Sequence, residues 1–292
     1  MIVITTPTGH IGSKVLNTLM QTNEKLRVIV RDPAKLSAEV KAKVEIFQGS
    51  LDDSAFVSKA YSHAEQVFFV IPPSNQYENV NEYYQKFSKV TCQAVRQQTV
   101  NRIVFVSGTG LGVEKNAGPV SASYLVEKEI EATGAATRIL HCGTFMENLF
   151  HSLQPIKFKG QFGTSVPIDI KAPWVAAQDI ADAAVKLLLD KSWSDCDSVG
   201  VLGPADLSYG EIAKMMTKIL GKDVSYQEIA EESLKALMVQ YGSSAPAAEG
   251  LVDIYAAMKN KTFNMLKRTK QNSSPTTFQH WLEVVFKPAM LK

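Results

Sequence analysis

The sequence has few of the residues that mark a secreted or metal-binding protein. Its 292 residues include only 3 cysteines and 5 histidines. The cysteines, Cys92, Cys142 and Cys196, are odd in number and widely spaced, which excludes a disulfide framework and favours a reducing compartment. Because the chain contains no C-x-x-C pair and no H-E-x-x-H pattern, we expect no metal site.

An excess of charge of one sign is also missing. The chain carries 31 Lys and Arg against 29 Asp and Glu, a formal net charge of +2. A protein that binds nucleic acid or an anionic membrane needs a concentrated basic surface, so neither partner is expected. No apolar run approaches the roughly 18 residues of a membrane helix, and the first residues lack the basic leader of a signal peptide. We therefore expect a cytoplasmic protein.

What the sequence does contain is a regular alternation of short apolar runs and longer amphipathic segments. The runs occupy residues 2–5, 26–30, 44–47, 67–71 and 103–106. They are uninterrupted and rich in Val, Ile and Phe, which is typical of strands buried on both faces of a parallel sheet. Strands that alternate with helices in this way need right-handed crossovers, so the pattern predicts a doubly wound sheet. A sixth strand is expected at 137–141, after a helix over 121–133.

The second half of the chain departs from this rhythm. We predict an irregular, partly extended excursion over 151–171, a helix over 178–189 and a last strand over 199–202 that rejoins the sheet edge. From residue 203 the apolar residues recur at helical spacing. The predicted fold is therefore α/β, a Rossmann-type doubly wound parallel sheet with a smaller, mostly helical C-terminal substrate lid. The expected division is 1–143 plus 172–202 for the sheet domain and 144–171 plus 203–292 for the lid.

A candidate phosphate-binding turn follows the first strand directly. Residues 5–12 read T-T-P-T-G-H-I-G and run into a helix. In a Rossmann fold the backbone of this turn approaches the cofactor pyrophosphate, and the N–H groups at the helix start face the phosphates. Gly9 suits the close approach and Gly12 the packing of helix on strand, but Thr6 stands where the G-x-x-G-x-x-G motif has its first glycine. An ordinary strand-to-helix turn is the alternative. The predicted cofactor contacts here are Thr6, Thr8, Gly9, His10, Ile11 and Gly12.

The end of the second strand indicates which dinucleotide is bound. It lies about 20 residues after the turn, where a dinucleotide fold contacts the adenosine ribose. An acid there would favour NAD, whereas Arg31 offers a planar charged fork to a 2′-phosphate and Lys35 adds a second charge. Asp32 precedes Pro33 and is expected to cap a helix. We therefore predict NADP(H) as the cofactor; the alternative is that Arg31 is a solvated surface charge.

Six segments together resemble the NmrA-like family of atypical short-chain dehydrogenases/reductases over most of the chain. They are residues 9–12, 30–35, 48–53, 67–73, 102–107 and 143–148. The resemblance implies an NAD(P)-binding Rossmann protein with Asp52 near the adenine. It also implies that the nicotinamide end of the site is formed by Ile71, Pro72, Ser107, Gly143 and Phe145.

A general acid is harder to place. Ketone reduction by a short-chain dehydrogenase uses a Tyr-x-x-x-Lys pair and an upstream serine, and this chain has Tyr124, Lys128 and Ser107. In the resemblance, however, Glu127 aligns with the glutamate one turn after the family's lysine, which puts Ser123 at the lysine position. Tyr124 and Lys128 would then be rotated away from the nicotinamide, as a half-buried tyrosine and a solvated lysine.

The absence of an assigned acid leaves two functions open. Hydride transfer to a quinone or conjugated acceptor gives an anion that solvent can protonate, so the protein need supply only proximity and orientation. His141, near the end of the sixth strand, is a further candidate donor, and a core or surface histidine is equally consistent with its position. We expect an NADPH-dependent reductase of a small quinone-like or conjugated acceptor. The alternative is a non-catalytic NADP(H)-sensing regulator that binds a protein partner.

Overall fold

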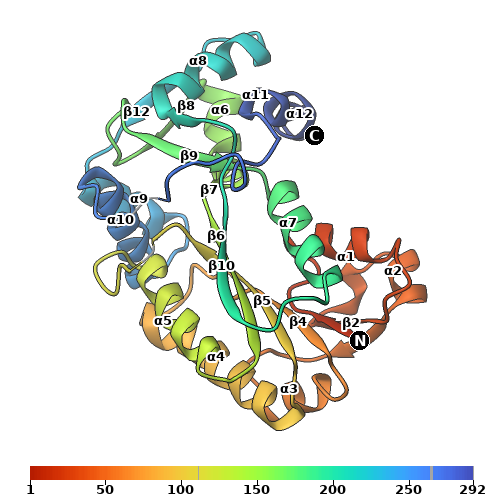
Figure 1. The fold of residues 1–292 in the computed structure, drawn as a ribbon. Coiled ribbons are helices and arrows are strands. Elements are labelled where there is room, and N and C mark those ends of the chain that lie inside the picture. Colours follow the sequence, from red (N-terminus) through yellow and green to blue (C-terminus); the bar gives the residue numbers. More distant parts are fainter. Residues whose placement is uncertain (111, 264–265, 292) are drawn as a thin grey trace.

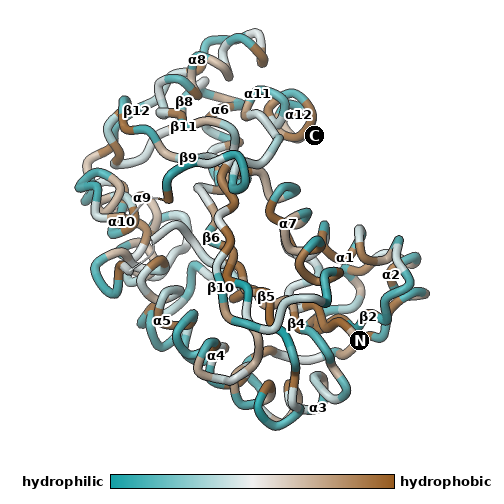
Figure 2. Tube along the Cα trace, in the orientation of Figure 1, coloured by the Kyte–Doolittle hydropathy of each residue, from teal (hydrophilic) through white to brown (hydrophobic). Residues whose placement is uncertain are grey.

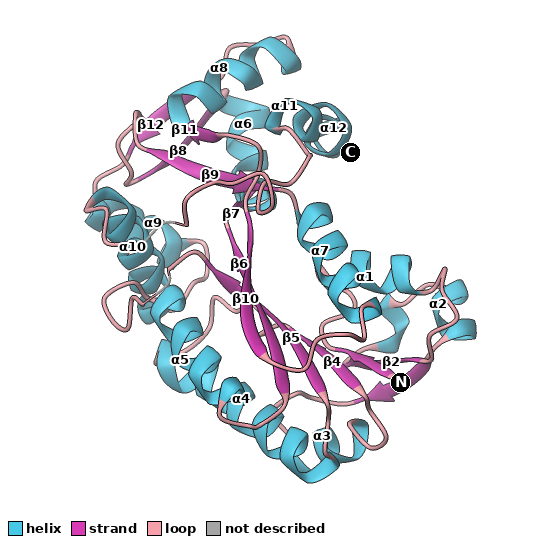
Figure 3. Ribbon diagram, in the orientation of Figure 1, coloured by secondary structure: helices cyan, strands magenta, loops and turns pink. Residues whose placement is uncertain are grey.

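The computed structural model describes residues 1–110, 112–263 and 266–291 and confirms the predicted α/β fold (Figures 1 and 3). Within these residues a seven-stranded parallel sheet has the order β10-β6-β5-β4-β1-β2-β3. Its strands are β1 (Ile2–Ile4), β2 (Leu26–Val30), β3 (Glu45–Gln48), β4 (Gln66–Phe69), β5 (Arg102–Gly108), β6 (Ala136–Cys142) and β10 (Cys196–Val201). The strand order reverses between β1 and β4, and dinucleotides bind outside the carboxyl ends of strands at such a point.

Helices cover both faces of this sheet. One face carries α1 (Gly12–Leu19), α2 (Ala38–Lys43) and α7 (Ala177–Leu189), and the other α3 (Ser54–Ala60), α4 (Val80–Gln98) and α5 (Pro119–Glu131). Side chains alternate along β1, so Ile2 and Ile4 join the first core while Val3 joins the second. Two buried faces explain the uninterrupted apolar runs, which Figure 2 shows in brown along the central strands.

A smaller unit lies beyond the carboxyl end of β6 (Figure 1). Its strands form the order β11-β9-β7 and the pair β12-β8, and its core includes Trp174, Tyr209, Trp281 and Phe286. The strands are β7 (Thr144–Phe145), β8 (Gln161–Thr164), β9 (Lys171–Val175), β11 (Asp206–Ser208) and β12 (Ser225–Glu228). The helices are η2 (Met146–Ser152), α6 (Leu153–Lys159), α8 (Tyr209–Leu220), α9 (Glu231–Gln240), α10 (Ala245–Lys259), α11 (Phe278–Trp281), η3 (Leu282–Phe286) and α12 (Lys287–Leu291).

Two predicted elements differ from the structure. The excursion over 151–171 is not irregular throughout, because residues 153–159 form α6, with Ile156 buried and Gly160 ending the helix at a φ of 62°. Pro155 lies in the first turn of α6, where proline removes no helical hydrogen bond. The last strand begins at Cys196 rather than Val199, because its first residues are exposed at the sheet edge and carry no apolar signal.

The second domain boundary is marked by a strand of the small sheet. β9 pairs with β7 and β11, and α7 and β10 then return the chain to the large sheet. We propose that 1–143 plus 172–202 and 144–171 plus 203–292 are the two units of the molecule, with β9 the strand that connects them. In the described residues no helix is both long and apolar enough to cross a bilayer.

Candidate functional site

The turn after β1 holds Thr6 in a conformation that favours glycine. Its φ is 48°, in the left-handed region, and its carbonyl oxygen accepts a hydrogen bond from the Gly9 N–H at 3.0 Å. A Cβ on Gly12 would lie 2.2 Å from the same oxygen, so glycine is required where α1 begins. Thr6 thus takes on backbone strain at the position of the missing first glycine.

The start of α1 is free of side-chain caps. The N-cap residue, Ile11, makes no capping hydrogen bond, and the first turn contains no acidic residue. Thr8, Gly9 and His10 are exposed beside it. Because the first N–H groups of a helix carry partial positive charge and lack helical partners, this end of α1 suits a phosphate group.

Two exposed cations follow β2. Arg31 and Lys35 are both exposed, and Lys35 ends the short 3₁₀ turn η1 (Pro33–Lys35). The Asp32 carboxylate accepts a hydrogen bond from the Ala34 N–H at 3.0 Å, which confirms the predicted cap. The acid is therefore bound to its own turn, and the two cations lie exposed beside it.

Asp52 has an ionic partner next to this site. Its carboxylate pairs with Lys86 of α4, and hydrogen bonds from Lys86 and Ser50 hold the pKa of Asp52 below its usual value. Burial raises the pKa of the Tyr83 hydroxyl, while the charge of Arg31 opposes that rise and the charge of Asp52 adds to it. Arg31, Asp52 and Tyr83 are therefore electrostatic neighbours, and a contact between Asp52 and the adenine remains a prediction.

The loop after β4 is tied to the turn after β1. Thr5 Oγ1 accepts a hydrogen bond from the Val70 N–H at 3.0 Å. The Tyr83 hydroxyl donates to the Pro72 carbonyl at 2.8 Å, and Ile71 is buried. The predicted cofactor residues Ile71 and Pro72 are thus held at the switch point of the sheet.

Four buried polar side chains meet at the carboxyl ends of β5 and β6. Ser107 Oγ donates to the Glu127 carboxylate and lies 2.9 Å from Ser123 Oγ, while His141 Nε2 lies 3.1 Å from Glu127 Oε2. Ser107 and His141 are direct partners across the two strands. Sequence reasoning considered Ser107 and His141 separately and missed their link through Glu127. The available signal was the i,i+4 spacing of Ser123 and Glu127, which puts both on one face of α5.

Tyr124 and Lys128 have contacts of their own. Lys128 Nζ pairs with Glu114 and lies 4.6 Å above the Tyr124 ring. Lys128 is exposed and Tyr124 half-buried, whereas the Ser107 hydroxyl is engaged inside the protein by Ser123 and Glu127. The described contacts do not assemble a Ser-Tyr-Lys site, so this pair stays a prediction from sequence.

A buried carboxylate joins the sheet to the lid after β6. Glu147 Oε2 accepts from the Ala177 N–H at 3.0 Å, and Oε1 accepts from Trp281 Nε1 at 3.1 Å. Just before it, a Cβ on Gly143 would lie 2.6 Å from the Pro173 carbonyl oxygen. This segment therefore holds η2, α7 and α11 together.

Aromatic contacts connect the turn to the lid. The His10 ring lies 5.8 Å from that of Phe150, which stacks on Phe286 at 5.9 Å. Phe145 is half-buried and packs on the core between the sheet and α7. The predicted cofactor residues His10 and Phe145 thus both lie where the sheet domain contacts the lid.

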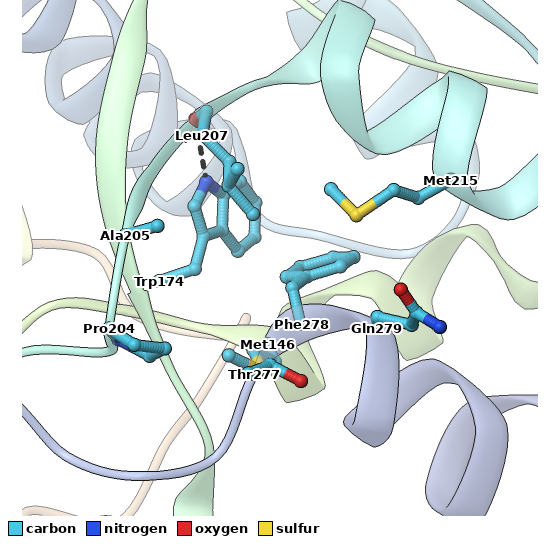
Figure 4. Close-up of a pocket in the computed structure, with 9 residues that line it drawn as sticks. All are labelled: Met146, Trp174, Pro204, Ala205, Leu207, Met215, Thr277, Phe278 and Gln279. Atoms are coloured by element: carbon cyan, nitrogen blue, oxygen red, sulfur yellow. Dashed lines mark hydrogen bonds between the residues drawn. The ribbon is translucent and has the colours of Figure 1, made fainter.

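The smaller unit also contains a half-open pocket of about 250 Å³ (Figure 4). Trp174 forms one wall, and its Nε1 donates to the Leu207 carbonyl at 3.0 Å. None of the predicted cofactor residues lines this pocket. Its lining is Met146, Trp174, Pro204, Ala205, Leu207, Met215, Thr277, Phe278 and Gln279.

Known proteins of similar sequence and fold include several reductases. The chain is 29% identical over 260 residues to an NAD(P)H azoreductase of Xenophilus azovorans, covering 88% of this chain and 86% of that protein. It is 24% identical over 281 residues to quinone oxidoreductase 2 of Escherichia coli strain K12, covering 95% of each. The crystal structure of the Citrobacter sp. triphenylmethane reductase complexed with NADP(H) superposes with a TM-score of 0.79 at 20% identity, covering 96% of this chain and 97% of that one.

A comparison with models of protein families shows to which family the chain belongs. The model of the NmrA-like family matches residues 1–282, nearly the whole chain. This match covers all six segments on which the sequence resemblance rests. The protein belongs to the NmrA-like family.

Proposed function

We propose that this protein is an NADPH-dependent oxidoreductase that transfers hydride to a small quinone-like or conjugated acceptor. The observation that carries the proposal is the pairing of an uncapped helix start at α1 with the exposed cations Arg31 and Lys35 after β2. The first suits a pyrophosphate and the second a 2′-phosphate. Gly9 and Gly12 carry no Cβ, and a Cβ at either position would lie within 3.3 Å of the Thr6 carbonyl oxygen.

The residues present therefore fit the dinucleotide, which supplies the hydride when bound. The protein's own contribution is to hold the acceptor against the cofactor with the correct geometry. Ile71, Pro72, Ser107, Gly143 and Phe145 are the residues proposed to position the nicotinamide end.

The acceptor class is inferred from the relatives. Their names describe an azoreductase, a quinone oxidoreductase and a triphenylmethane reductase. Azo compounds, quinones and triphenylmethane dyes share an extended conjugated system that accepts hydride. We infer an acceptor with the same property for this chain.

One observation favours the second candidate, a regulator that binds NADP(H) and a protein partner without turnover. Ser123 occupies the position at which the family resemblance expects a lysine, and Lys128 is held by Glu114 instead. A site without the usual acid is compatible with binding alone.

Absorbance measurements separate the two candidates. Purified protein is mixed with NADPH and a panel of quinones and conjugated dyes, and NADPH oxidation is followed. Turnover above the protein-free rate supports the reductase. Tight NADPH binding without oxidation across the panel supports the regulator, and absence of NADPH binding contradicts both.

A further inference from the structure

Ser107, Glu127 and His141 form a continuous hydrogen-bonded chain inside the protein. The Glu127 carboxylate accepts from Ser107 through one oxygen and contacts His141 Nε2 at 3.1 Å through the other. The three residues are only 5%, 6% and 1% exposed. A carboxylate and an imidazole are expensive to bury, and apolar side chains of similar volume would fill the space at lower free-energy cost. The burial of these three polar side chains therefore indicates a role beyond packing.

This hydrogen-bonded network also extends to the proposed nicotinamide site. Ser107 lies near the carboxyl end of β5 beside the switch point, and His141 is its direct partner on β6. Ser107 is the member of the chain predicted to lie at the nicotinamide. Glu127 and His141 are placed behind it, on α5 and β6.

A single proton separates two hydrogen-bond arrangements of this chain. When Glu127 is ionised, it accepts from both the Ser107 hydroxyl and the Nε2–H of a neutral His141, so the Ser107 proton points into the protein. When Glu127 is protonated, its O–H donates to Ser107 Oγ, and the Ser107 proton is free to point elsewhere. His141 Nδ1 has no partner among the described residues, which fits a ring whose proton is on Nε2.

We propose that Glu127 and His141 are positioning residues that load a proton onto Ser107, and that Ser107 delivers it to the reduced acceptor. This inference rests on the proposed function. A quinone becomes a hydroquinone by taking one hydride from NADPH, which is oxidised to NADP⁺, and one proton. The Ser107 O–H bond breaks as the acceptor oxygen gains the proton, Ser107 regains a proton from the Glu127 carboxyl group, and Glu127 regains one from water between turnovers.

Other titratable side chains on the surrounding elements have hydrogen-bond partners outside the Ser107–Glu127–His141 network. These hydrogen bonds join Lys128 with Glu114, Glu129 with Ser88, Arg102 with the Trp193 carbonyl, Arg138 with Asp195, and Asp179 with Thr276. Burial raises the pKa of the Cys142 thiol on β6, of the Cys92 thiol on α4 (to about 12) and of the Asp253 carboxyl on α10. Among the described residues, the relay is therefore assigned to Ser107, Glu127 and His141.

Two acceptors with different proton requirements test the relay. A quinone needs hydride and a proton, whereas a cationic triarylmethane dye is neutralised by hydride alone. In Glu127→Gln, we expect kcat for the quinone to fall roughly 10²-fold. The rate with the dye and the Kd for NADPH should be unchanged. Glu131→Gln, an exposed position on the same helix, is the matched control and should behave as the wild type.

Rescue by a conservative variant supplies a readout that a structural role would not give. Glu127→Asp keeps a carboxyl group that can carry a proton, so it should retain more of the quinone rate than Glu127→Gln, although Gln is closer to Glu in size. An equal loss with both acceptors would show that Glu127 only maintains the structure. An unchanged quinone rate in Glu127→Gln would exclude the relay.

Infrared spectroscopy tests the same chain without turnover. A protonated-carboxyl band should be present in the wild type and in Glu131→Gln, and be missing in Glu127→Gln. If the wild type reduces neither acceptor, the reductase proposal fails, while this band still decides whether Glu127 carries a proton. If no band is lost in Glu127→Gln, the relay is wrong whatever the activity.

Discussion

The carbonyl oxygen of Thr6 lies 2.2 Å from the point at which a Cβ on Gly12 would stand. The Thr6 oxygen is a backbone atom and a Cβ is fixed to the backbone, so any larger residue at position 12 must displace α1 or the turn. We expect Gly12→Ala to lower the free energy of unfolding by about 1–3 kcal/mol and to weaken NADPH binding. Urea denaturation and a fluorescence titration measure the two effects, with the exposed Asn17→Ala on α1 as control. Wild-type stability and affinity in Gly12→Ala would show that the turn relaxes freely.

Thr6 itself is a strained residue, and relieving the strain should stabilise the protein. A left-handed φ costs an L-residue about 1–2 kcal/mol. A glycine avoids this strain but loses roughly 0.5–1 kcal/mol of the gain, because its greater conformational freedom stabilises the unfolded chain. Thr6→Gly should therefore raise the free energy of unfolding by about 0.5–1 kcal/mol. Thr6→Ala keeps the strain and should give no such gain. A loss of stability in Thr6→Gly would mean that the threonine side chain makes a contact worth more than the strain.

Arg31 is predicted to determine the choice of cofactor. Losing a charged hydrogen bond to the 2′-phosphate costs about 1.5–3 kcal/mol, so Arg31→Asp should raise the Kd for NADPH roughly 10- to 100-fold. NADH lacks this phosphate, and its Kd should change far less. Lys41→Asp, an exposed charge reversal on α2, controls for the change in overall charge. Equal weakening of both dinucleotides in Arg31→Asp contradicts the assignment.

Glu147 is predicted to support the lid rather than to catalyse. Removing its carboxylate leaves the Ala177 N–H and Trp281 Nε1–H without their acceptor, and each unpaired buried donor costs about 1–3 kcal/mol. Glu147→Ala should therefore lose about 2–6 kcal/mol of stability in chemical denaturation. Glu147→Gln keeps one acceptor oxygen and should lose less. The exposed Glu283→Ala is the control, and a loss no greater than in that variant would contradict the supporting role.

The Asp52–Lys86 ion pair should contribute stability that is lost in acid. The pKa of Asp52 is lower in the folded protein than its usual value, so the contribution is present above that usual value and disappears as pH falls through the folded pKa. Both groups are partly exposed, and Lys86→Ala should cost less than about 1 kcal/mol at neutral pH. Urea denaturation over a pH series should show the difference from wild type shrinking in acid. A difference that persists undiminished, or one matched by Lys89→Ala, would assign the effect to something other than this pair.

Local sequence was sufficient to predict the large sheet and to propose the edge at which a dinucleotide would bind. Each central strand is buried on both faces, so its apolar run can be read without knowing its neighbours. Arg31 and the turn at Thr6–Gly12 were found because the topology of a doubly wound sheet brings the carboxyl ends of its strands to one edge. The edge strand β10 was located less accurately, because its first residues face solvent.

Three-dimensional packing determined the contacts on which the proposed proton relay rests. Ser107 meets His141 because β5 and β6 pair in one particular register, and Glu127 reaches both because α5 packs across those strands. Lys128, one residue further along the helix, faces solvent and pairs with Glu114. Neighbouring helix positions point about 100° apart, so the angle at which α5 docks decides which side chain enters the site. That angle depends on contacts between residues far apart in the chain, which no local pattern records.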